Sequence, residues 1–144
     1  NGSCAVGPFL RLFDASFTLD DVRNASVRLE IEGEDGFRLA ETSEMARISR
    51  DPLELVRQAS GANHHYPDGF ALFLGTMFAP VQDREALGRG FTHRPGDIVR
   101  ISCPELGVLE NRVGLCSEIP PWTFGLGALM RNLASRGLLR EGQS

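Results

Sequence analysis

The strongest candidate for chemistry in this sequence is the stretch FLGTMFAP, residues 73–80. An apolar run stops there on Gly75-Thr76 and then resumes. A glycine at the end of a strand lets backbone N–H groups come close to a ligand, and a threonine hydroxyl adds one donor and one acceptor. The pair therefore suits a carboxylate or keto oxygen of a substrate, although an ordinary turn explains the same two residues.

Histidines offer a weaker signal, in His64-His65-Tyr66 and at His93. Neighbouring residues of a strand point to opposite faces, so His64 and His65 are poorly placed to bind one metal ion on a strand. A loop or surface role is favoured for all of these histidines over a metal or general-base role.

Glu30 and Glu32 form an ExE pair of the kind that can bind a cation. They lie in residues 26–32, where Val27, Leu29 and Ile31 alternate with polar residues, which predicts a half-buried strand. The apolar side of this strand faces the core, so the two glutamates are expected on its solvated face. The sequence contains neither a phosphate-binding glycine loop nor a GxSxG nucleophile motif, and no catalytic residue is assigned.

Composition excludes several classes of protein. The chain has 144 residues, 42% of them hydrophobic, and a net charge of −4, which fits one globular domain and gives no reason to expect nucleic acid as a partner. No apolar run reaches the roughly 18 residues of a membrane span, so no membrane association is expected. Three cysteines without CxxC spacing argue against a disulfide framework or a structural zinc site and favour a cytoplasmic location.

The elements that must position these residues are short. Capping and alternation patterns predict about six strands and two or three helices, with hairpins that favour antiparallel pairing. The fold class expected is α+β, mainly β, with peripheral helices. The predicted elements are a helix at 18–24, a hairpin at 26–40 with its turn at 33–36, a helix at 52–60, a buried strand at 70–74, a lid-like loop at 81–95, strands at 97–102 and 108–115, and a helix at 126–138.

Seven segments, in order, resemble the C-terminal part of the fumarylacetoacetate hydrolase superfamily, and together they span nearly the whole chain. Within it the sequence is most similar to the bacterial 2-keto-3-deoxy-pentonate (xylonate or arabinonate) dehydratases. The segments are SCAVGPFLRLFD, EGEDGF, ISRDP, YPDGFALFLGTMFAP, GRGFTHRPGDIVRIS, LGVLENRV and PWTFGLGALMRNLASRGLL.

The resemblance implies a mixed β-roll and a magnesium ion that chelates a small 2-keto acid. It implies dehydration of a 2-keto-3-deoxy sugar acid, with C–C bond hydrolysis as the alternative. Gly75 and Thr76 match the family's Gly-Thr substrate loop, in which backbone and hydroxyl groups bind substrate oxygens. Family members also commonly form homodimers.

The metal ligands of the family precede the segment that matches SCAVGP, so no metal ligand is expected within residues 1–144. The chain is therefore expected to be the C-terminal portion of a single catalytic domain that lacks the N-terminal part of the roll. Alone it is expected to be inactive. A further alternative is a catalytically incomplete domain that acts only in self-association.

Overall fold

The computed structural model describes residues 5–7, 9–75 and 80–139. The chain divides into two compact units, Asn1–Gly114 and Leu115–Ser144, which are described separately. The first unit contains every strand and every candidate site residue discussed below.

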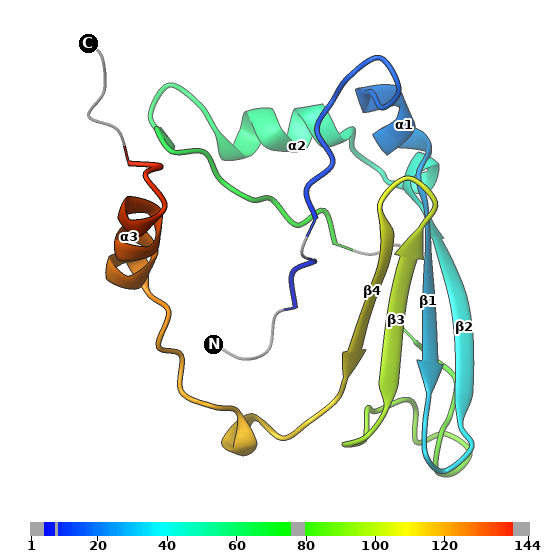
Figure 1. Ribbon diagram of the computed structural model, residues 1–144. Coiled ribbons are helices and arrows are strands. Elements are labelled where there is room, and N and C mark those ends of the chain that lie inside the picture. The colour runs from blue at the N-terminus through cyan, green and yellow to red at the C-terminus, as the bar shows by residue number, and fades with distance from the viewer. Residues whose placement is uncertain (1–4, 8, 76–79, 140–144) are drawn as a thin grey trace. The chain divides into compact units, whose positions relative to one another are not determined.

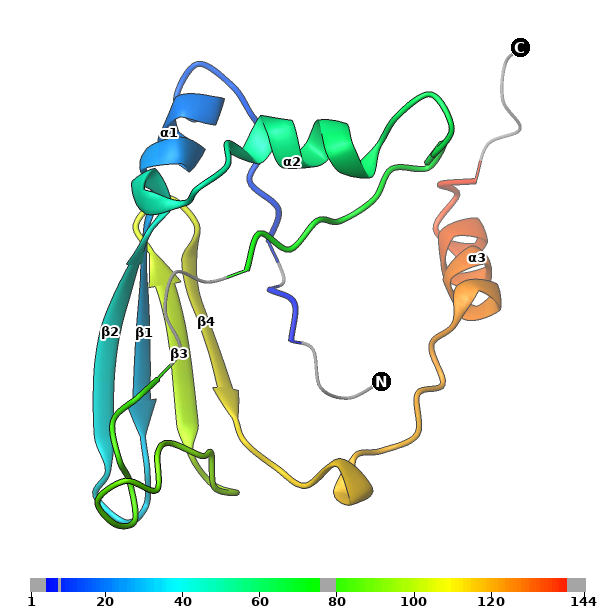
Figure 2. The same cartoon turned by 180° about the vertical axis from the view of Figure 1, so that it is seen from behind.

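A four-stranded antiparallel sheet forms the centre of the first unit, in the order β2-β1-β3-β4 (Figures 1 and 2). The predicted strand at 26–32 is confirmed with the same bounds. Its alternation places Ile31 opposite Leu39 of the next strand, and these two side chains are among the most buried of the described residues. The strands are β1 Ser26–Glu32, β2 Arg38–Glu44, β3 Ile98–Cys103 and β4 Gly107–Arg112.

The turn between β1 and β2 is the predicted hairpin turn. The Gly33 N–H donates to the Phe37 carbonyl at 2.9 Å, and Gly36 has a positive φ of 81°, a conformation that favours glycine. The second strand of the hairpin extends to Glu44, four residues beyond its predicted end.

Helices α1 (Leu19–Asn24) and α2 (Pro52–Ala59) lie at the opposite end of the sheet from this turn (Figures 1 and 2). Both begin as their sequences predict. The Asp21 carboxylate accepts hydrogen bonds from the backbone and hydroxyl of Thr18, and the Asp51 carboxylate accepts the Leu53 N–H at 2.9 Å. A short 3-10 helix, Met45–Arg47, follows β2.

The second unit contains a 3-10 helix, Cys116–Glu118, and helix α3, Leu126–Ser135. The helix ends three residues before its predicted end because Gly137 takes φ 67° and Leu138 donates back to the Leu133 carbonyl. None of the helices in the described ranges is long and apolar enough to cross a membrane.

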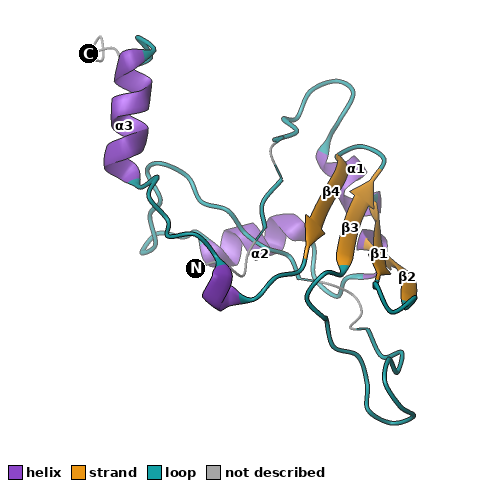
Figure 3. Cartoon of the chain, turned by 60° about the horizontal axis from the view of Figure 1, so that its bottom comes forward, coloured by secondary structure: helices purple, strands orange, loops and turns teal. Residues whose placement is uncertain are grey.

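The predicted buried strand at 70–74 is wrong. Figure 3 shows the described part of the chain between α2 and β3 in teal, as loop without helix or strand. The side chains of Phe70, Leu72 and Phe73 are 41%, 39% and 72% exposed. A strand requires a neighbouring backbone to pair with, and the ladders of the described residues join only the strands β1, β2, β3 and β4 to one another. The chain is therefore an α+β protein with a four-stranded antiparallel sheet and few helices.

Candidate functional site

Gly75 lies at the end of the apolar segment 70–74, and Thr76 lies outside the described residues. Gly75 is exposed and has φ 79°, in the region that side-chain-bearing residues rarely adopt. A Cβ atom built at this position would meet nothing within 4 Å. The glycine is therefore required by the backbone conformation rather than by lack of space.

An apolar hollow of about 460 Å³ lies beside the segment that leads to Gly75. Alternate residues of that segment line it, with apolar side chains of α1 and α2 across from them. Its lining contains no polar residue, so it suits apolar groups rather than the oxygens of a sugar acid. The lining residues are Phe13, Leu19, Val22, Pro52, Leu53, Val56, Phe70, Leu72 and Leu74.

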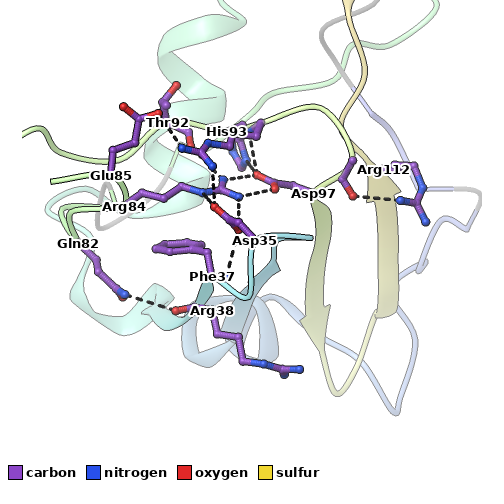
Figure 4. A network of polar contacts seen from close by, with 12 residues as sticks. Asp35, Phe37, Arg38, Gln82, Arg84, Glu85, Thr92, His93, Asp97 and Arg112 are labelled. Atoms are coloured by element: carbon purple, nitrogen blue, oxygen red, sulfur yellow. Dashed lines mark hydrogen bonds and ion pairs between the residues drawn. The ribbon is translucent and has the colours of Figure 1, made fainter.

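A buried ionic cluster centred on Arg84 lies at the other end of the sheet (Figure 4). The side chains of Arg84 and Asp97 are each only 1% exposed. The guanidinium donates to both oxygens of Asp97, at 2.6 and 2.7 Å, and to both oxygens of Asp35, at 3.1 and 3.0 Å. It also donates to the Thr92 carbonyl at 3.2 Å. Two forked pairs and one carbonyl use all five N–H groups, so Arg84 is a structural arginine with no donor left for a ligand.

Three separate parts of the chain build this cluster. Asp35 belongs to the β1–β2 turn, and Asp97 directly precedes β3. Arg84 belongs to the chain between α2 and β3. The Phe37 ring lies 4.7 Å from the guanidinium carbon, a cation–π contact that covers Arg84. Asp83 closes the loop by accepting the N–H groups of two glycines. The loop expected to act as a lid is thus tied to the sheet at its base.

The cluster shifts the acidity of its carboxyl groups. Hydrogen bonds from Arg84 lower the pKa of Asp35 from 3.8 to about 2, against an opposing contribution from desolvation. Hydrogen bonds from Arg84 to Asp97 are likewise the main reason that the pKa of Asp97 is lowered. The two carboxylates in turn raise the pKa of Arg84, so all three groups are charged at neutral pH.

The stability of the first unit is expected to fall in acid because of these shifts. A carboxyl group with a lowered pKa binds its proton less readily in the folded chain than in the unfolded chain. Its stabilisation is therefore present above the ordinary pKa of 3.8 and is lost as the pH falls towards about 2. Denaturant unfolding between pH 2 and 7, followed by far-UV circular dichroism, measures this loss. An Asp35→Asn variant should show a shallower decline than wild type; an equal decline would contradict the assignment.

The two glutamates lie on the solvated face of β1, as predicted. Glu32 accepts hydrogen bonds from Arg38 at 2.7 Å and Arg100 at 3.1 Å, and both arginines lower its pKa. Glu30 pairs with Arg28 at 3.0 Å. Both glutamates are therefore paired with arginines on an open surface of the sheet, and they do not line an enclosed site.

The three histidines make separate contacts. His64 forms an isolated bridge with Gly61, and the His65 ring nitrogen lies 2.6 Å from the Ala62 carbonyl oxygen. His93 is 43% exposed, stacks edge-on against Phe91 and has its Nδ1 atom 3.7 Å from Asp97. Within the described ranges, no group of three or more His, Cys, Asp or Glu side chains could hold a metal ion.

The sequence reading missed the Arg84 cluster. The sequence places Asp97 at a turn and at the start of the strand 97–102, and Arg84 in a polar loop, and no local pattern joins them, because the hydrogen bond from Arg84 to Asp35 spans 49 residues. Arg84 is one of three arginines in its loop, with Arg89 and Arg94, so no local pattern distinguishes it. The features described are the exposed Gly75 with its positive φ, an apolar hollow and a saturated ionic cluster. No family model, curated protein or solved structure matches this chain.

Proposed function

We propose that these residues form part of an enzyme of the fumarylacetoacetate hydrolase superfamily that acts on small 2-keto acids. The reaction proposed is dehydration of a 2-keto-3-deoxy sugar acid, with C–C bond hydrolysis as the alternative. The resemblance of seven ordered segments, including the Gly-Thr pair, carries this proposal. The positive φ of Gly75 supports it, because a substrate loop of this type needs a glycine that exposes its backbone.

The proposal gives Gly75 and Thr76 a substrate-binding role. The backbone at Gly75 and the hydroxyl of Thr76 would hold the carboxylate or keto oxygen of the substrate. Dehydration then removes a proton from C3 and expels the hydroxyl from C4. The group that takes the proton is not assigned to any residue of this chain.

The described residues do not fit the magnesium ion that the family uses, because they offer no suitable group of acidic, histidine or cysteine side chains. No step of the reaction is therefore derived through a metal here. In this proposal the ion belongs to the family's ExE segment, which precedes the segment matched by residues 3–8. The proposed enzyme is cytoplasmic and forms a homodimer.

Replacing Thr76 by valine tests the proposal in a protein that combines these residues with the family's ExE segment. Valine keeps the shape of the side chain and removes the hydroxyl, so the affinity for 2-keto-3-deoxy-D-xylonate should fall about two- to ten-fold, the loss of one hydrogen bond. Turnover with magnesium and the thermal midpoint are measured together. Thr76→Ser, which keeps the hydroxyl, should stay close to wild type.

Two outcomes would contradict the substrate role. The first is a loss of thermal stability in Thr76→Val without a change in KM, which would make the hydroxyl structural. The second is magnesium-dependent turnover by the 144-residue chain alone, which would contradict the assignment of the metal to another segment.

Self-association without catalysis is the second candidate, and the exposed apolar side chains favour it. Phe73 is 72% exposed, and the adjacent hollow is lined only by apolar residues. The mass of the chain in solution, measured together with the turnover assay, separates the two candidates. A multiple of the 15.8 kDa chain mass in solution, with no turnover when the ExE segment is present, would support self-association and overturn the enzyme.

A further inference from the structure

The loop formed by residues 84–94 starts and ends at the same carboxylate. Asp97 accepts the guanidinium of Arg84 at its start and the backbone N–H of Arg94 at its end, the latter at 2.9 Å. Because the Arg84 and Asp97 side chains are buried, water and salt reach this base poorly. The base of the loop is therefore held by two short, buried hydrogen bonds between Arg84 and Asp97, which do not involve residues 85–93.

The outer contacts of the same loop are exposed. The Arg94 guanidinium, 41% exposed, pairs with Asp35 at 2.9 Å and with Glu85 at 2.8 Å. The Phe91 ring lies 5.7 Å from the Phe37 ring of the β1–β2 turn. Exposed ion pairs contribute little to stability and weaken with salt. The outer part is thus held to the hairpin less firmly than the base is.

We propose that residues 85–93 form a flap that opens on the buried Arg84–Asp97 base. In the closed state the Phe91 ring packs against Phe37 and the Thr92 carbonyl accepts from Arg84; Figure 4 shows Thr92 and Phe37 close to the Arg84 guanidinium. Opening breaks the Arg94 ion pairs and the hydrogen bond from Arg84 to the Thr92 carbonyl, and it separates the two phenylalanine rings, while Arg84 keeps its bonds to Asp97. The sheet stays folded in both states. This inference is independent of the proposed function.

NMR relaxation dispersion on the 144-residue chain tests the flap, because this method detects opening on the microsecond-to-millisecond timescale. The Arg94→Gln variant removes both exposed ion pairs and keeps the backbone N–H that bonds Asp97. The open population should rise about two- to five-fold. Raising the salt concentration of the wild-type sample to 1 M should produce a change in the same direction.

Arg50→Gln is the matched control, because Arg50 makes an exposed ion pair with Glu54 on α2, outside the loop. It should leave the exchange of residues 85–93 unchanged. The proposal is overturned if these residues show no exchange in either wild type or Arg94→Gln, or if salt has no effect on them. It is also overturned if the exchange spreads through β1 and β2, since that pattern indicates unfolding of the sheet rather than opening of a flap.

Discussion

Replacing Arg84 with lysine is expected to lower the free energy of unfolding of the first unit by about 2 kcal/mol, the typical cost of leaving buried hydrogen-bonding groups without partners. Lysine keeps the positive charge but has three donors on one nitrogen atom. It cannot bond both oxygens of Asp97 and both oxygens of Asp35, so some of these atoms lose their partners in a buried site. This loss is a large fraction of the total stability of a typical domain, which is about 5–15 kcal/mol.

Hydrogen exchange of the β1 and β3 amides is the appropriate measurement for this variant. The method follows residues of the sheet itself, whereas Trp122, the only tryptophan, belongs to the second unit. Arg94→Lys is the matched control, because Arg94 pairs with the same Asp35 but is 41% exposed. It should change the exchange of these amides little. If both lysine variants lowered the stability of the first unit equally, the burial of Arg84 would contribute nothing to that stability.

The parts of this fold that sequence predicts are those with a local physical cause. The alternation of residues 26–32 gave β1 with its bounds, because side chains of a strand alternate between faces whatever lies beyond them. Thr18 marks the start of α1 and Asp51-Pro52 the start of α2, since capping contacts join groups only two or three residues apart and proline fits the first helical position. Each of these signals lies within a few residues of its effect.

The parts that sequence failed to predict depend on distant partners. Residues 70–74 have the composition of a buried strand, but composition cannot supply a neighbouring backbone, and the described residues provide none. The Arg84 cluster joins positions separated by 13 and 49 residues. The substrate role of Gly75 and Thr76 stays a prediction, with the glycine's backbone conformation in its favour.

Gly33 is a second position at which a small change should have a large effect. A Cβ atom there would lie 2.3 Å from an Arg84 nitrogen, 2.3 Å from an Asp35 oxygen and 3.2 Å from an Asp97 oxygen. The backbone of Gly33 is not in the positive-φ region, so alanine meets a steric obstacle and not a backbone one. Gly33→Ala is expected to destabilise the first unit by about 2 kcal/mol, the typical cost of overpacking a filled site.

This variant separates the effect of packing from that of charge. It keeps every charged group of the cluster, but the added Cβ displaces the Arg84, Asp35 and Asp97 side chains from one another. Gly61→Ala is its control: a Cβ there meets nothing within 4 Å and φ is not positive, so its stability should equal or slightly exceed that of wild type. Hydrogen exchange of the β1 amides compares the two. If Gly33→Ala matched Gly61→Ala, Arg84 would have room to move aside, and the close fit around its guanidinium would not be what fastens the loop to the hairpin.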